Sequence, residues 1–181
     1  MKMHHRISIA ILLIAVSAPA LVSYPAQAAE KGYRYWGYFQ AKPGVKVWTE
    51  AQTGPSISMK DGSVEGWAFT FSGGSVSKAA TPRTAPNFAS ICGKTDPVDK
   101  KKRVAIVVDF GNPLLAPKGE IAPKSLTRCA VLDEKAIGVD VLNKVVKVRS
   151  SSSGFVCGFN NYPRKECGIE IPTPFGLRVK K

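Results

Sequence analysis

Two carboxylates, Asp61 and Glu65, are the residues of this sequence best suited to acid–base chemistry, because they lie close together in a segment rich in aromatic residues. Glycoside hydrolases use a pair of carboxyl groups for catalysis, and aromatic rings commonly surround a sugar-cleaving site. Asp61, however, precedes Gly62 in a turn-like sequence, where aspartate usually has a structural role. A carboxylate hydrolase is therefore the least favoured functional hypothesis.

Other catalytic arrangements are missing from the chain expected to remain after processing. The only histidines are His4 and His5, both in the leader described below, so that chain cannot build serine–histidine or cysteine–histidine catalysis or a histidine metal site. Ser75 to Lys78 match the S-x-x-K pattern of serine acyl-enzymes, but no helical pattern or K-T-G partner accompanies them. The sequence contains no C-x-x-C pair, the spacing typical of structural zinc sites. We therefore predict a non-enzymatic protein with no catalytic residue, metal site or cofactor.

A set of aromatic and charged residues in the first half of the chain forms the candidate ligand site. Binding sites are mostly apolar with a few polar groups that orient the ligand. The leading hypothesis is an extracytoplasmic small-molecule-binding module in which rings form an apolar platform and two charged side chains orient the ligand. The alternative is that the rings are the core of a small domain, since large rings dominate cores. The candidate residues are Arg34, Trp36, Tyr38, Trp48, Glu65 and Trp67.

Positive charge supports a second functional hypothesis. The chain has 26 lysines and arginines against 13 acids, a formal net charge of +13, and loss of Lys2 and Arg6 would leave +11. Such an excess favours association with anionic cell-wall or lipid surfaces, with no specific nucleic-acid partner predicted. The densest basic run, 100–103, directly precedes an apolar segment and is interpreted as a solvated turn.

The first 28 residues have the layout of a secretory signal peptide. Lys2 and Arg6 precede an apolar run over 7–22, and Ala26-Gln27-Ala28 forms a cleavage site. The alternative is a membrane anchor, but the run is shorter than the roughly 20 residues that span a bilayer. We expect a secreted, extracellular domain over 29–181, with an aromatic-rich part at 29–90 and a disulfide-bonded part at 91–181.

Four cysteines in an exported chain predict two disulfides. Three pairings are possible. The order along the chain favours Cys92 with Cys129 and Cys157 with Cys167, because the second pair flanks a turn-like segment at 160–163.

Alternating and continuous apolar patterns predict the elements that position these residues. In the strand at 64–71, a period of two places Glu65, Trp67, Phe69 and Phe71 on one face. The apolar run at 104–108 predicts a central strand buried on both faces. A helix is predicted over 139–148, with Gly138 as its N-cap. The result is an α+β fold with a small, mostly antiparallel sheet and one helix. The remaining expected segments are strands at 33–40, 45–48, 128–132 and 154–159, long connections at 72–90 and 111–124, and an extended tail at 169–179.

Two sequence blocks carry a resemblance to a known family. Tyr35-Trp36-Gly37-Tyr38-Phe39 and Asp61-Gly62-Ser63-Val64-Glu65-Gly66-Trp67-Ala68-Phe69 resemble the Y-W-x-Y/F and D-G-x-V-E-G-W-x-F motifs of a family of secreted proteins from high-GC Gram-positive bacteria, whose biochemical activity is unassigned. Further likeness covers Cys92, 104–111, 129–131 and 157–168.

The resemblance implies a partner and a mode of attachment. Family members are often encoded beside energy-coupling-factor type transporters. The resemblance therefore implies an accessory role in vitamin or metal uptake, with a small molecule or the transporter itself as the partner. The C-terminal half also resembles the small β-grasp-like domain of cobalamin carriers. Many members end in a hydrophobic anchor, whereas this chain ends in Arg178-Val179-Lys180-Lys181, which favours release or electrostatic wall association.

Overall fold

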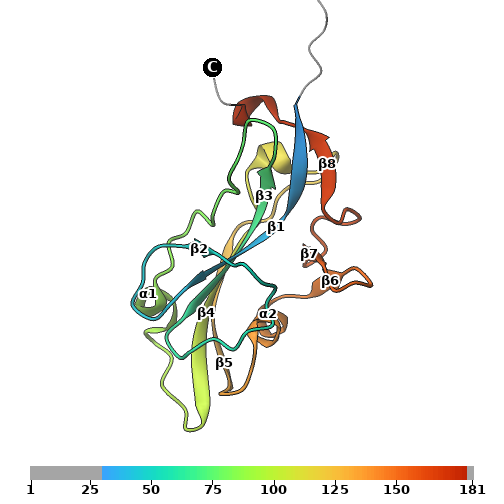
Figure 1. The fold of residues 1–181 in the computed structure, drawn as a ribbon. Helices are drawn as coiled ribbons and strands as arrows, with labels where there is room; N and C mark the ends of the chain where they lie inside the picture. The colour runs from blue at the N-terminus through green and yellow to red at the C-terminus, as the bar shows by residue number, and fades with distance from the viewer. Residues whose placement is uncertain (1–29, 179–181) are drawn as a thin grey trace, which may run out of the picture.

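The computed structural model describes residues 30–178, so the predicted signal peptide at 1–28 lies outside the described residues. A six-stranded sheet in the order β2-β1-β3-β4-β5, with β8 also paired to β1, forms its centre (Figure 1). Its strands are β1 (Lys31–Ala41), β2 (Thr49–Glu50), β3 (Val64–Ser72), β4 (Lys101–Asp109), β5 (Leu126–Asp133) and β8 (Ile169–Pro172).

One of the strand pairs in the main sheet is parallel. Most neighbouring strands are antiparallel, but β3 and β4 are parallel, with Val64 opposite Ala105 and Ala68 opposite Asp109. The crossover between them contains the short helix α1 (Phe88–Cys92). The longer helix α2 (Gly138–Val145) follows β5, and the hairpin of β6 (Val148–Ser150) and β7 (Val156–Phe159) forms a separate two-stranded sheet. Two 3-10 turns, η1 (Pro113–Leu115) and η2 (Phe175–Leu177), complete the elements.

These elements confirm the predicted fold class. The fold is α+β, the sheet is mostly antiparallel, and the disulfides join Cys92 to Cys129 and Cys157 to Cys167 as predicted. In the C-terminal half, β4 and β5 continue the sheet of β1 and β3, whereas the β6–β7 hairpin forms a small sheet apart from it. Helix α2 begins one residue earlier than predicted and ends at Val145 rather than at residue 148. Its N-cap is Ile137, not Gly138, and the Ile137 backbone N–H donates to Asp140 at 2.9 Å.

The predicted strand at 45–48 is wrong. The chain turns at Pro43-Gly44, and only Thr49 and Glu50 pair with β1. The Trp48 indole Nε1 donates to the Thr84 carbonyl at 3.1 Å, which holds this segment against the crossover loop. Alternation of apolar residues therefore does not mark a strand here, because Val45 and Val47 are exposed and only Trp48 packs against the fold.

The basic run at 100–103 is also wrongly interpreted as a solvated turn. Lys101 to Arg103 belong to β4, and the period of two places Lys102 on the face beneath α2, where it is buried. Its ammonium group donates to Ser58 Oγ at 2.8 Å and to the carbonyls of Glu134 and Ala136 at 2.9 and 2.5 Å. Only Lys100 remains in the turn.

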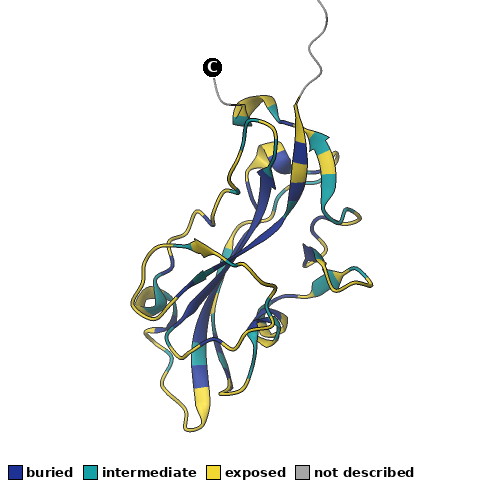
Figure 2. Ribbon diagram, viewed as in Figure 1, coloured by how far each residue is buried: buried dark blue, intermediate teal, exposed yellow. Residues whose placement is uncertain are grey.

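The sheet separates two apolar clusters of different size. Helix α2, the β6–β7 hairpin and the rings of β1 and β3 cover one face, whereas α1, Trp48 and Val107 belong to the smaller cluster on the other face. The apolar run Val104–Val108 is completely buried between them, as predicted for a central strand (Figure 2). Among residues 30–178, no helix is long and apolar enough to cross a membrane.

Candidate functional site

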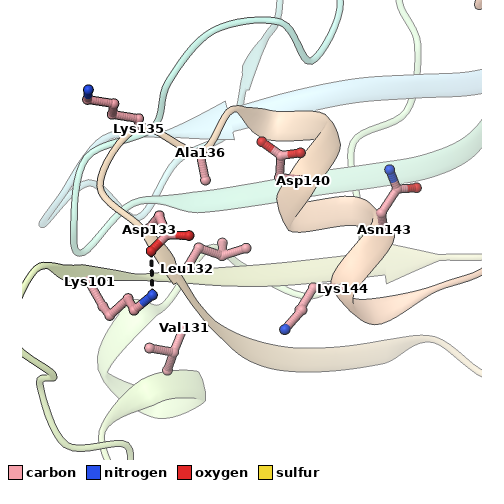
Figure 3. A pocket seen from close by; sticks show the side chains of 9 residues that line it. All are labelled: Lys101, Val131, Leu132, Asp133, Lys135, Ala136, Asp140, Asn143 and Lys144. Atoms are coloured by element: carbon pink, nitrogen blue, oxygen red, sulfur yellow. Dashed lines mark hydrogen bonds and ion pairs between the residues drawn. The ribbon is translucent and has the colours of Figure 1, made fainter.

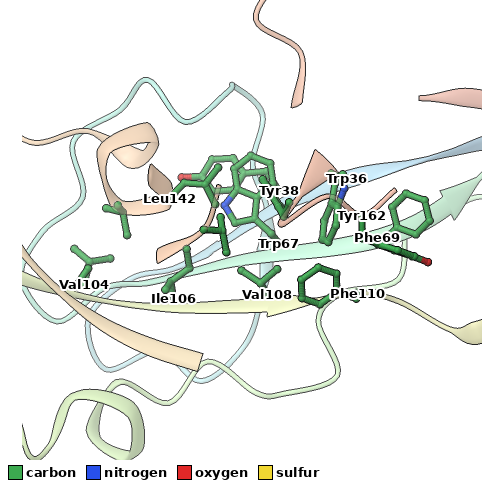
Figure 4. Close-up of a cluster of buried hydrophobic side chains, with 14 of the residues drawn as sticks. Trp36, Tyr38, Trp67, Phe69, Val104, Ile106, Val108, Phe110, Leu142 and Tyr162 are labelled. Carbon is green, nitrogen blue, oxygen red and sulfur yellow. The ribbon is translucent and has the colours of Figure 1, made fainter. Parts of the chain in front are cut away.

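Three of the predicted site residues lie in the larger apolar cluster. Trp36, Tyr38 and Trp67 are at most 8% exposed. Tyr38 stacks on Trp67 with ring centroids 4.5 Å apart, and Phe159 packs against both tryptophans at 4.3 and 5.4 Å (Figure 4). These contacts fill the space between the sheet and the elements above it.

Trp48 is not part of this group. It packs on the opposite face of the sheet, where its six-membered ring covers Gly66 so closely that a Cβ there would lie 2.6 Å from the ring. The structure therefore does not bring Trp36, Trp48 and Trp67 together on one platform.

Arg34 is buried and has two strong partners. Its guanidinium donates to the Leu115 carbonyl at 3.0 Å and to Glu166 at 2.5 Å. It thereby fixes η1 and the segment before β8, and it acts as a positioning residue for the crevice described below.

Glu65 is buried beside the start of α2, next to Gly138. Tyr38 donates its hydroxyl to Glu65 Oε1 at 2.8 Å and accepts from Gln40 Nε2 at 2.7 Å. Glu65 Oε2 has no hydrogen-bond partner within residues 30–178. A Cβ at Gly138 would lie 2.6 Å from Oε1, so only glycine lets the helix sit this close. Burial raises the pKa of Glu65 to about 8, although the Tyr38 hydrogen bond and nearby Lys102 act in the opposite direction.

Asp61 and Glu65 therefore occupy different environments. Asp61 is half-exposed and accepts the backbone N–H of Arg103 at 2.7 Å as well as two guanidinium hydrogen bonds. The Arg103 hydrogen bonds lower the pKa of Asp61, and they hold the turn at Gly62 against β4. Glu65 is completely buried and faces α2.

An enclosed hollow lies beyond the carboxyl end of β4, where β3 continues with β1 on one side and without β4 on the other. Ala68 and Asp109 are the last paired residues of β3 and β4, and β3 extends to Ser72. Sheet ligands commonly bind at the carboxyl ends of parallel strands. A crevice of about 250 Å³ occupies this place. Its apolar wall consists of Phe69, Phe71, Val76, Ala80, Leu115 and Leu177.

Hydrogen bonds pin the loops that enclose this crevice. The backbone N–H of Ala80 donates to Thr70 Oγ1 at 2.8 Å, and that of Arg83 donates to Asp109 Oδ2 at 2.8 Å. Gly111 has a positive φ of 85°, and a Cβ there would lie 2.3 Å from the Phe69 carbonyl oxygen. The chain can therefore leave β4 over β3 only with glycine at this position.

An ion pair stands at the mouth of the crevice. Arg83 Nη2 donates to Asp109 Oδ1 at 2.5 Å and Arg83 Nε donates to Oδ2 at 2.8 Å. Burial opposes the charged form of Asp109, but these bonds and those from the backbone N–H groups of Arg83 and Gly111 lower its pKa. Because the Arg83 side chain is 62% exposed and that of Asp109 only 3%, the mouth presents the cation to solvent.

A second, larger hollow of about 620 Å³ lies between α2 and the start of β4 (Figure 3). Lys101 and Asp133 form an ion pair across its floor, while Lys135 points away from them. The hydrogen bond and charge of Lys101 lower the pKa of Asp133, with a smaller contribution from Lys144. Acids and lysines are mixed here, so the hollow is no concentrated cationic site.

Sequence reasoning missed Arg83 and Asp109. Asp109 directly follows the buried run 104–108 and precedes Gly111, which is a usable signal for a functional strand end. Arg83 gave no signal, because it lies in the long connection at 72–90, whose polar composition predicts only a loop.

Comparison with known proteins identifies the domain. Residues 28–172 match the family model described as the SCO2322-like domain. No curated protein and no solved structure matches this chain. Because the matched segment covers most of the chain, the protein belongs to the SCO2322-like domain family.

Proposed function

We propose that this protein is a secreted, non-enzymatic binding protein whose ligand site is the crevice beyond the carboxyl end of β4. The observation that carries the proposal is an apolar hollow with one exposed cation at its mouth, enclosed by loops that hydrogen bonds hold in place. Ligand sites are commonly apolar with a few orienting polar groups. Two disulfides suit an oxidising compartment and support the extracellular part of the proposal.

The crevice limits the ligand to a small molecule. Its volume of about 250 Å³ lies below the roughly 300–1,000 Å³ of sites for drug-sized ligands. The apolar wall would receive a short hydrocarbon or flat apolar group. The Arg83 Nη1 group makes no hydrogen bond to residues 30–178, so it can donate to a carboxylate or phosphate on the same ligand.

The family resemblance extends the proposal to an accessory role in uptake. In that role the protein would hold a small anionic compound for an energy-coupling-factor type transporter. A whole corrinoid is too large for this crevice, so a corrinoid that bound would contact another surface.

We expect sodium octanoate to bind with a Kd on the order of 1 mM, because about ten non-hydrogen atoms at small-ligand efficiencies give that affinity. Octan-1-ol should bind about tenfold more weakly, since it lacks the charge that Arg83 recognises. Titration followed by amide chemical shifts in two-dimensional NMR measures both constants and shows which residues respond.

The Val76→Phe variant should fill the crevice and abolish the octanoate shifts. Val47→Phe introduces the same ring at an exposed valine outside the crevice and is the matched control. Absence of octanoate binding to the wild-type protein, or unchanged binding in a folded Val76→Phe variant, would contradict the proposal.

A further inference from the structure

An exposed apolar patch occupies the end of the molecule where both chain termini leave the fold (Figure 1). We name it the terminal patch, and it consists of Leu114 in η1 and Phe175 in η2. Phe175 is 86% exposed and Leu114 is 53% exposed. Large apolar side chains at such exposure are costly in water unless they meet another apolar phase.

The two side chains belong to one surface although they are far apart in sequence. A Cβ at Gly176 would lie 2.5 Å from Leu114 Cδ1, so η2 packs directly on Leu114. Arg34 supports this arrangement from below, because it donates to the carbonyl of Leu115. The terminal patch is therefore formed by two short turns seated on the fold.

A cationic side chain lies against the terminal patch. The guanidinium of Arg178 lies 5.7 Å from the centre of the Phe175 ring, and Arg178 Nε donates to the Thr173 carbonyl at 3.2 Å. The chain continues from Arg178 with Val179, Lys180 and Lys181. The acids nearby are Glu30, whose carbonyl accepts from Thr173, and Glu170, which is paired with Lys31 at 3.1 Å. Arg178 is therefore the described cation in contact with the terminal patch, and the sequence that follows it adds two further lysines.

We propose that the terminal patch docks on the surface of an anionic lipid bilayer, with Phe175 and Leu114 inserted among the headgroups. Apolar side chains next to cations are the combination that binds peripheral proteins to such surfaces, because hydrocarbon burial and attraction to anionic lipids add. The turns η1 and η2 also contribute Leu115 and Leu177 to the crevice wall, but the terminal patch consists of other, exposed side chains. Docking and ligand binding can therefore be tested by separate variants. The octanoate experiment can fail without affecting this proposal.

The test is co-sedimentation of the full mature chain, residues 29–181, with vesicles. Binding is expected to vesicles of phosphatidylcholine with one quarter phosphatidylglycerol, and much weaker binding to phosphatidylcholine alone. Phe175→Ser should lower the partition coefficient about tenfold or more, because burial of one large apolar side chain is lost. Lys180→Gln with Lys181→Gln should lower it about 25-fold, because each cation contributes about fivefold. Val47→Ser, at an exposed apolar residue far from the terminal patch, should bind like wild type.

A fluorescence measurement reports insertion itself. The Phe175→Trp variant should show a blue-shifted emission when phosphatidylglycerol vesicles are added, whereas Val47→Trp should show none. Equal binding of wild type and Phe175→Ser, or no emission shift at position 175, overturns the proposal. Adsorption to purified cell-wall polymer that exceeds vesicle binding and ignores Phe175→Ser also overturns it, since charge alone would then explain the association.

Discussion

We expect the Trp67→Ala variant to lose about 3–5 kcal/mol of unfolding free energy, the range for truncation of a buried large aromatic side chain. Trp67 is 2% exposed, stacks on Tyr38 and meets Phe159 edge-on at 5.4 Å. It stands at the centre of the larger apolar cluster, where the β3 backbone cannot move into the cavity. Urea unfolding followed by circular dichroism measures the loss.

Trp48→Ala is the matched control for this prediction. Trp48 is partly exposed and packs in the smaller cluster, so its truncation should cost about 1–2 kcal/mol. If both variants lost the same stability, the distinction between core and surface tryptophan drawn from the structure would be incorrect.

The second large effect is a pH dependence of stability caused by Glu65. Burial raises its pKa in the folded protein to about 8, while the unfolded chain has the ordinary value of 4.5. Between these values the folded state holds a proton that the unfolded state has released, so the unfolding free energy falls as pH rises. The expected loss is about 3 kcal/mol between pH 5.5 and pH 8.

The Glu65→Gln variant should lose this slope, because its amide does not titrate yet can still accept from the Tyr38 hydroxyl. Asp61, Asp109 and Asp133 have lowered pKa values and titrate below this pH window. Glu170→Gln, at an exposed acid, should keep the wild-type slope. Urea midpoints at pH 5.5, 6.5 and 8 decide the matter, and parallel profiles for wild type and Glu65→Gln would refute the assignment.

Much of the fold could be predicted, because the local pattern of apolar residues in the sequence matches the side chains that are buried in the folded protein. The period of two in 64–71 is visible in the sequence, and β3 does place Trp67, Phe69 and Phe71 in the larger cluster. The segment at 45–48 has the same local pattern, but its position depends on the Trp48 bond to Thr84, which no local pattern shows. The five-residue helix α1 was missed for a similar reason, since the disulfide to Cys129 ties it to the sheet.

The candidate site was harder to predict than the fold. Residue types alone do not distinguish an aromatic pocket from an aromatic core, and Trp36 and Trp67 lie in the core. The crevice exists because β3 continues to Ser72, beyond its last pairing with β4 at Ala68, and because a distant loop brings Arg83 to Asp109. The whole chain determines which strands pair and where each pairing ends. The residues that line the crevice therefore share no local sequence signal.

The pairing of β1 with β8 has a consequence for the order of events during biogenesis. Among the described strands, β1 is synthesised first, but its edge at residues 31–34 is completed only by residues 169–172. A chain that emerges from its amino end cannot close the sheet until nearly all of it is available. Closure of this sheet edge must therefore follow synthesis of residue 172, and until then the backbone groups of residues 31–34 lack their native strand partner.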